Sequence, residues 1–307
     1  MPLDSDTKNM LDMLQQMGVP DFADTTPEQA RAMSLSAPPA EPTAVASVAD
    51  QVLATGAGNV PVRIYRPENP NGAALMYFHG GGWVVGSIES HDETCRELCS
   101  TAAVTVISVD YRLAPETIYP GAVEDCFAAT AYIAEHASDF DIDPNRIAVG
   151  GDSAGGNLAA AVALMARDQG TPALAFQLLI YPVTDANFER QSCIDNAEGY
   201  FLTTRAMRWF WDHYVPDEAM RNEPLASPLQ AANLANLPPA LLLTAEFDPL
   251  RDEGEAFAAA LSAAGNAVTH TRYDGLVHGF FGMQQTVAAA RPAMQQASAA
   301  LRAALAP

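Results

Sequence analysis

The sequence is poor in cationic side chains, with 16 Lys and Arg residues against 37 Asp and Glu residues in a chain of 307. Lys8 is the single lysine, and the formal net charge is −21 at pH 7. Such a surface repels phosphate backbones and anionic lipid headgroups, so we expect no nucleic-acid partner and no stable membrane association. The charge is compatible with an ordinary solvated acidic surface and also with adaptation to salty surroundings.

Long apolar runs are missing as well, although 49% of the residues are hydrophobic. No stretch approaches the roughly 18 uninterrupted apolar residues that a membrane span needs. The acidic start, Met1 to Asp6, lacks the basic and apolar regions of a signal peptide, and we expect a cytoplasmic protein. The few cysteines form neither a disulfide framework nor zinc-type pairs, so we expect free thiols and no metal site. They are Cys95, Cys99, Cys126 and Cys193.

What the sequence does contain is an alternation of strand and helix patterns. We predict strands within residues 60–66, 73–78, 104–109, 147–150, 173–181, 240–245 and 267–273, and helices within 121–137, 154–167, 252–264 and from about 286. This alternation predicts an α/β fold, with a mostly parallel sheet covered by helices on both faces.

Two segments depart from the alternation. The first 40 or so residues are helix-prone and weakly apolar, with a helix start at Thr26-Pro27-Glu28 and a proline-rich stop at residues 37–42. Residues 185–228 mix aromatic and charged side chains after a strand's carboxyl end, where open α/β sheets bind ligands. We interpret the second segment as an inserted helical cap; the alternative is a surface excursion that packs on its own aromatics. We therefore divide the chain into an N-terminal helical segment that contributes to the cap (1–44), an inserted cap (185–225), and a catalytic domain in two parts (45–184 and 226–307).

The central motif of the chain is Gly151-Asp152-Ser153-Ala154-Gly155, which follows a strand pattern and precedes an alanine-rich helix pattern. This is a G-x-S-x-G motif, which places a serine on a sharp turn between strand and helix. Glycine is needed two positions to either side because a larger side chain would collide across the bend. The motif makes Ser153 the candidate nucleophile.

A serine hydroxyl needs a histidine base and an acid that orients the base. Among the six histidines, His278 is the best candidate because it follows the last predicted strand and precedes Gly279. Asp248 ends a buried strand pattern, and Pro249 keeps it out of helical geometry, so it is the candidate acid. For the neighbouring acids, Asp252 and Glu253 are expected to cap the next helix, and Glu246 to support the loop.

Acyl transfer also requires N–H donors for the oxyanion. His79-Gly80-Gly81-Gly82-Trp83 follows a strand pattern, and its glycines allow the backbone to turn N–H groups inward. A glycine-rich loop can also hold phosphate, but the chain has no G-x-x-x-x-G-K-[ST] or G-x-G-x-x-G pattern there. Ala154 offers another N–H at the start of the helix after Ser153.

Five motifs in order give the chain a clear resemblance to the bacterial hormone-sensitive-lipase-like esterases, the GDXG lipolytic family, from about Val45 to the C-terminus. They are His79-Gly-Gly-Gly-Trp, Tyr111-Arg-Leu-Ala-Pro-Glu, Gly151-Asp-Ser-Ala-Gly-Gly, Asp248-Pro-Leu-Arg-Asp-Glu and His278-Gly-Phe. The resemblance implies a carboxylesterase with an α/β-hydrolase fold, no cofactor, and a cap built from residues 1–40 and 185–225.

The resemblance also implies a role for each motif residue. It makes Ser153 the nucleophile, Asp248 the acid and His278 the base. It implies oxyanion donors from Gly81, Gly82 and Ala154, and supporting positions at His79, Gly80, Gly151, Asp152 and Gly155, with His79 organising its loop. The expected substrate is a small-molecule ester of short to medium acyl chain.

Alternatives remain open from the sequence. An amidase or an acyltransferase could share this fold and these residues. A non-enzymatic small-molecule receptor is a third possibility, but such a protein is expected to lack a member of the triad. A homodimer through the edge strand at residues 267–273 is expected from the resemblance.

Overall fold

The structure is a computed structural model that describes residues 2–34 and 41–307. Within these residues eight strands form one sheet in the order β1-β2-β4-β3-β5-β6-β7-β8. β1 and β2 are antiparallel to each other, β2 is antiparallel to β4, and the other pairs are parallel. The strands are β1 (Ser47–Thr55), β2 (Gly58–Arg66), β3 (Ala74–Phe78), β4 (Thr105–Val109), β5 (Ile147–Asp152), β6 (Phe176–Ile180), β7 (Ala240–Phe247) and β8 (Val268–Val277). The predicted, mostly parallel sheet is therefore confirmed.

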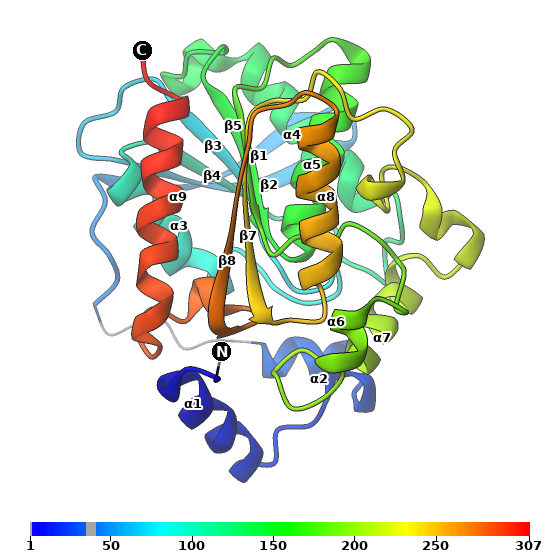
Figure 1. Ribbon diagram of the computed structural model, residues 1–307. Helices are drawn as coiled ribbons and strands as arrows, with labels where there is room; N and C mark the ends of the chain where they lie inside the picture. Colours follow the sequence, from blue (N-terminus) through cyan, green and yellow to red (C-terminus); the bar gives the residue numbers. More distant parts are fainter. Residues whose placement is uncertain (1, 35–40) are drawn as a thin grey trace.

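Helices cover both faces of the sheet (Figure 1). On one face lie α3 (Asp92–Ala102) and α9 (Arg291–Ala304); on the other lie α4 (Gly121–Glu135), α5 (Ala154–Gln169) and α8 (Arg251–Ala263). Every residue of β3, β4, β5 and β6 is buried. These strands read as continuous apolar runs because parallel strands with helices on both faces expose neither face to water.

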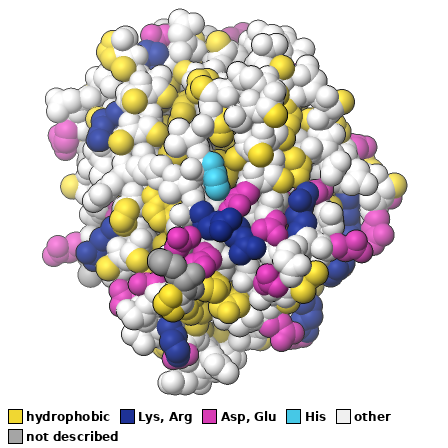
Figure 2. All heavy atoms as spheres, viewed as in Figure 1, with side chains coloured by type: hydrophobic (Ala, Val, Ile, Leu, Met, Phe, Trp, Pro, Cys, Tyr) yellow, Lys and Arg dark blue, Asp and Glu magenta, His cyan; other side chains and the backbone are white. Residues whose placement is uncertain are grey.

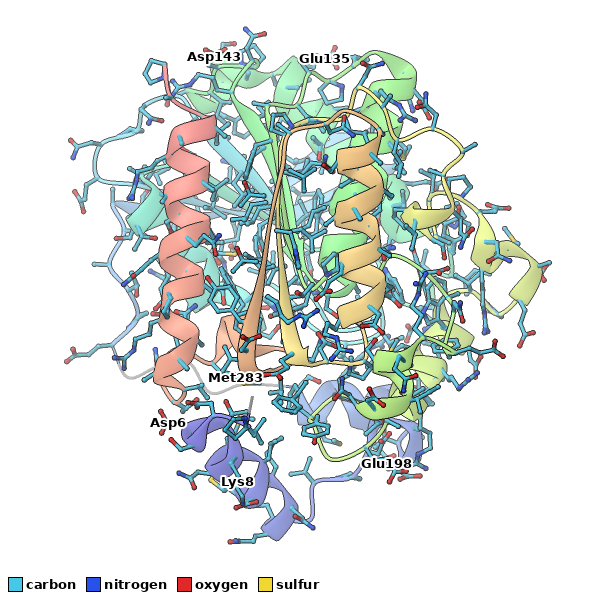
Figure 3. All side chains as sticks on the ribbon, in the orientation of Figure 1. Asp6, Lys8, Glu135, Asp143, Glu198 and Met283 are labelled. Atoms are coloured by element: carbon cyan, nitrogen blue, oxygen red, sulfur yellow. The ribbon has the colours of Figure 1, made fainter. Side chains whose placement is uncertain are left out.

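The remaining α-helices gather at one end of the sheet (Figure 1). They are α1 (Ser5–Gln16), α2 (Pro27–Met33), α6 (Gln191–Asp195) and α7 (Thr204–Tyr214). Figure 3 shows Asp6 and Lys8 of α1, together with Glu198, at the end where Met283 lies, whereas Glu135 and Asp143 mark the opposite end. The N-terminal segment and the insertion thus lie at the same end of the sheet.

Most predicted elements are confirmed, with local corrections. α2 begins as predicted, with Thr26 and Gln29 forming a reciprocal capping box. The C-terminal helix begins at Arg291 rather than near 286, after a short 3₁₀ helix, and α3 was not predicted. Positions 37–40 of the predicted proline-rich stop lie outside the described residues.

Short 3₁₀ helices complete the described secondary structure. They span Phe22–Asp24, Glu89–His91, Ala137–Phe140, Glu218–Asn222, Pro228–Gln230, Phe280–Gly282 and Ala288–Ala290. No helix in the described part of the chain is long and apolar enough to cross a membrane.

Many of the cationic side chains on the surface lie beside carboxylates. On the face shown in Figure 2, Lys and Arg side chains lie beside Asp and Glu side chains. Elsewhere, Arg63 on β2 contacts three carboxylates: those of Asp50 at 2.6 Å and of Glu89 and Asp92 at 3.3 Å each. Such surface pairs are worth at most about 1 kcal/mol each, so they do not determine the fold.

The strand register brings the candidate residues to one edge of the sheet. Phe78 of β3 lies opposite Gly151 of β5, and Asp152 of β5 lies opposite Ile180 of β6. Phe247 of β7 lies opposite Val277 of β8. The residues that follow these strands therefore leave the sheet side by side at its carboxyl edge, which is where open α/β sheets bind ligands.

Candidate active site

Ser153 lies on a strained turn between β5 and α5. Its backbone has φ 55° and ψ −117°, a region that costs a non-glycine residue about 1–3 kcal/mol. Its N–H donates to the carbonyl of Ile180 at 2.8 Å, which fixes the turn to the neighbouring strand. A Cβ at either Gly151 or Gly155 would overlap the carbonyl oxygen of Phe78. The two glycines are thus required because the turn presses against β3.

The structure brings the three candidate triad residues together from three loops. His278 Nε2 lies 2.9 Å from Ser153 Oγ, and His278 Nδ1 lies 2.7 Å from Asp248 Oδ2. Asp248 is fully buried, and its other oxygen accepts the N–H of Leu250 at 2.8 Å. An ionised carboxylate only accepts hydrogen bonds, so Nδ1 carries a proton and Nε2 is free to accept one from the serine. This arrangement is suited to nucleophilic acyl transfer.

The loop that carries Asp248 is held by the insertion. Asn196 Nδ2 donates to the carbonyl of Asp248 at 3.2 Å, and Ser192 Oγ donates to the carbonyl of Pro249 at 2.7 Å. The N–H of Ser192 in turn donates to Asp252 Oδ2 at 2.8 Å. These contacts were not expected from the sequence, because more than fifty residues separate the partners and neither forms a local motif.

Glu253 corrects the expectation that it caps a helix. It lies in the first turn of α8 but is fully buried, and its Oε1 accepts the N–H groups of Thr184 and Asp185 at 2.7 and 3.2 Å. Its carboxyl group therefore anchors the chain that leaves β6. Burial, reinforced by the nearby Asp185 carboxylate, raises the pKa of Glu253 well above its ordinary value.

The glycine-rich loop after β3 takes a left-handed backbone at three successive residues. Gly81, Gly82 and Trp83 have φ of 117°, 56° and 61°. Gly81 and Gly82 line the same cavity as Ser153, and Ala154 begins α5 directly after the serine. Successive backbone N–H groups in a turn can form a concave site for an anion. The loop can therefore accept the oxyanion of an acyl-transfer intermediate.

Asp152 connects this loop to the serine turn. Its Oδ1 accepts the N–H of Gly80 at 3.0 Å and the hydroxyl of Tyr77 at 2.7 Å, and His91 Nε2 lies 3.3 Å away. Burial alone would raise the pKa of Asp152, but His91 and the hydrogen bonds outweigh burial and lower it. The sequence did not point to Tyr77 and His91, because only the pairing of β3 with β5 and the 3₁₀ helix before α3 bring them to Asp152. Asp152 is thus an ionised anchor beneath both candidate oxyanion segments.

His79 has contacts that keep its own loop in place. Its Nδ1 lies 2.8 Å from the carbonyl of Gly80, and the hydroxyl of Tyr111 donates to the His79 carbonyl at 2.7 Å. The ring is fully buried and stacks on Tyr111, with 4.3 Å between centroids. Burial, with help from nearby His91, lowers the pKa of His79 to about 3. His79 is therefore uncharged near neutral pH.

A cavity of about 1270 Å³ opens over the serine. One wall is the carboxyl edge of the sheet, including Ser153 and His278, and the other comes from the N-terminal segment and the insertion, including Phe22, Phe201 and Phe210. The wall around the histidine is aromatic too, since the rings of Tyr181 and His278 have centroids 4.6 Å apart. The cavity suits a small ligand with an apolar part.

Comparison with known proteins reveals similarity over most of the chain. The alpha/beta hydrolase fold family matches residues 75–282. The carboxylic ester hydrolase LipN of Mycobacterium tuberculosis is 44% identical over 263 residues, which make up 83% of this chain and 70% of LipN. The ethyl acetate hydrolase of Pseudomonas putida is 43% identical over 242 residues, 77% of this chain and 76% of that protein. The crystal structure of a thermostable esterase from Pseudomonas putida matches with a TM-score of 0.94 and 40% identity, covering 100% of this chain and 98% of the other.

Proposed function

The chain belongs to the hormone-sensitive-lipase-like carboxylesterases of the α/β hydrolase family, and from this premise we propose that it hydrolyses small esters of short to medium acyl chain. It is a carboxylic ester hydrolase. The observation that carries the finer proposal is the contact of Ser153 with His278 inside a cavity covered by helices. A covered cavity accommodates a small acyl group more readily than the surface of a lipid droplet.

In the proposed mechanism His278 Nε2 takes the proton of Ser153 as its Oγ attacks the ester carbonyl. The N–H groups of Gly81, Gly82 and Ala154 hold the oxyanion of the tetrahedral intermediate. His278 then gives the proton to the departing alcohol, which leaves an acyl-enzyme on Ser153. Water, deprotonated by His278, hydrolyses that acyl-enzyme, and Asp248 keeps the imidazole oriented throughout.

The domain division and the homodimer remain part of the proposal. We assign the cap to residues 1–44 and 185–225, which is supported by the shared place of α1, α2, α6 and α7 at the carboxyl end of the sheet (Figure 1). β8 is the last strand of the sheet, and the side chains of its first seven residues are exposed or partly exposed, which supports pairing of this edge with a second copy. A monomeric mass in solution would exclude the homodimer.

The test is hydrolysis of p-nitrophenyl acetate, butyrate, octanoate and palmitate by the wild type and by Ser153→Ala. We expect activity on the shorter esters and its loss by about 10⁴- to 10⁶-fold in Ser153→Ala. Ser298→Ala is the matched control, because Ser298 is a buried serine on α9. It should keep wild-type activity.

Two outcomes would contradict the proposal. Highest activity on palmitate would contradict the chain-length assignment, and activity retained by Ser153→Ala would contradict the nucleophile. Comparing an ester with an anilide of the same acyl group separates an esterase from an amidase. The receptor alternative would require His278 to be out of reach of Ser153, and the 2.9 Å contact argues against it.

A further inference from the structure

Trp83, the last residue of the glycine-rich loop, is enclosed by the insertion. Its side chain is 1% exposed, and its backbone φ of 61° is a genuine outlier for a bulky residue. The indole stacks on the ring of Tyr214, with 4.2 Å between centroids and 12° between planes. The ring of Trp211 meets it edge-on at 5.1 Å. Both partners lie on α7, so this helix holds the side chain of the strained residue.

The preceding residue is covered by the same helix. A Cβ at Gly82 would overlap ring atoms of Phe210, so the Phe210 ring lies directly against the backbone of Gly82. Phe210 is itself supported from the N-terminal segment, because its ring centroid lies 5.2 Å from that of Phe22. Two successive loop residues are thus packed against three aromatic rings of α7.

Hydrogen bonds, rather than ring contacts, hold the two ends of the glycine-rich loop. The N–H of Gly80 donates to Asp152, and the N–H groups of Val84 and Val85 donate to the carbonyl of Gly81. These bonds fix the two ends of the loop. The peptide groups of Gly82 and Trp83 lie between them. The carbonyl of Trp83 accepts the N–H of Ala114 at 2.9 Å, and the left-handed conformation of both residues is supported from outside by ring packing.

We propose that α7 is the outer clamp of the oxyanion loop, and that Tyr214 is a positioning residue for the reaction through its stack on Trp83. This inference rests on the proposed function, because it concerns the N–H donors assigned there. Without the stack, Trp83 loses its closest ring contact and is held less firmly in its costly left-handed conformation. The adjoining peptide groups then rotate, and the N–H of Gly82 no longer points at the oxyanion.

The test compares Tyr214→Leu with Tyr214→Phe. The Tyr214 hydroxyl is buried and has no hydrogen-bond partner among the described residues, so phenylalanine keeps the stack and loses nothing else. Active enzyme is counted by titration with a p-nitrophenyl phosphonate, which modifies the nucleophilic serine. The kcat and KM for p-nitrophenyl acetate are then measured per titrated site. A third measurement is the inhibition constant of an alkyl trifluoromethyl ketone, whose hemiketal oxyanion needs the same donors.

Loss of one oxyanion donor costs about 10²- to 10³-fold in kcat, and a misdirected donor should cost less. We expect Tyr214→Leu to lower kcat per titrated site by about 10- to 100-fold, with KM within about threefold, and the inhibition constant of the ketone to rise with the fall in kcat/KM. Tyr214→Phe should restore both values. Tyr132→Leu is the matched control, because Tyr132 of α4 stacks on His136, the residue after that helix, at a centroid distance of 4.1 Å and outside the cavity wall.

Equal kcat per titrated site in Tyr214→Leu and Tyr214→Phe would overturn the clamp. A fall in the number of titratable sites alone would also overturn it, because that result means a purely structural role. If Tyr214→Leu does not fold, Tyr214→Met, which has no flat ring, takes its place in the same measurements. A wild type that the phosphonate does not modify would instead contradict the proposed nucleophile, so the two failures are distinguishable.

Discussion

The two walls of the cavity are held by different kinds of interaction. On the sheet side, backbone atoms touch closely at Gly155, and fully buried carboxylates, such as those of Asp248 and Glu253, accept hydrogen bonds from the loops. On the cap side, exposed ion pairs contribute, such as Arg205 with Asp24 at 2.6 Å. Removing a buried hydrogen-bond acceptor is costly because it leaves its donors unpaired, whereas an exposed ion pair contributes little to stability. The reacting atoms therefore lie on the wall that backbone contacts and buried carboxylates hold, whereas the other wall combines exposed ion pairs with the buried rings of α7.

Among the substitutions that test this difference between the two walls, Gly155→Ala should have the largest effect on stability and activity. Alanine normally stabilises a helix relative to glycine, by about 1 kcal/mol. At position 155 the added Cβ would overlap the carbonyl of Phe78, so the start of α5 and the end of β3 must move apart. We expect Gly155→Ala to lower the free energy of unfolding in urea by about 3 kcal/mol or more and to abolish activity.

Gly56→Ala is the control for this change. Gly56 lies in the exposed turn between β1 and β2, and a Cβ there meets no atom within 4 Å. Its free energy of unfolding should stay within about 0.5 kcal/mol of the wild type. Equal effects of the two substitutions would show that the serine turn is not as tightly packed as the structure indicates.

A smaller effect, dependent on pH, is expected at Glu253. Its pKa is raised in the folded state, so between its unfolded and folded pKa values the folded protein keeps a proton that the unfolded chain releases. The free energy of unfolding of the wild type therefore falls as the pH rises between these two pKa values, by up to about 1.4 kcal/mol per pH unit. Glu253→Gln removes the titration and keeps an oxygen for the N–H groups of Thr184 and Asp185.

Urea unfolding from pH 5 to pH 9 checks this prediction. The stability of Glu253→Gln relative to the wild type should increase as the pH rises. Glu253→Ala should be less stable than the wild type at the acid end, because it leaves two buried N–H groups without an acceptor. A difference between Glu253→Gln and the wild type that stays constant with pH would mean that the carboxyl group titrates alike in both states.

The smallest effect on stability and activity is expected for the loss of the ion pair between Arg205 and Asp24 on the cap side. Arg205 donates two hydrogen bonds to Asp24, at 2.8 and 2.6 Å, but both side chains are largely exposed and screened by water. We expect Arg205→Gln to leave Tm and the kcat for p-nitrophenyl acetate unchanged, both at low salt and at 1 M NaCl. A fall in Tm larger than that of Gly56→Ala would show that this ion pair holds the cap in place.

The sequence was sufficient to predict the features that are local. The apolar runs of β3 and β5 indicate buried strands, so the sheet could be predicted. The glycines two positions before and after Ser153 indicate a sharp turn from strand to helix, so the serine turn could be predicted as well. The position of Asp248 at a strand end was predictable for the same reason.

Features that depend on distant partners could not be predicted. The hydrogen bond of Tyr77 to Asp152 joins residues 75 positions apart, and the stack of Trp83 on Tyr214 exists only after the insertion has folded over the loop. Glu253 looked like a helix cap because acidic residues favour the first helical turn. Its burial beneath the chain after β6 depends on how α8 packs.

The hydrogen bonds from Ser192 and Asn196 to the loop of Asp248 determine where this protein could be recombined with a relative. A chimera that exchanges residues 185–225 as one block would separate the acid's loop from the side chains that secure it. A cut placed after Asn196 would leave those bonds native while still replacing α7. Exchange of substrate preference between such esterases should therefore succeed with the second junction and fail with the first.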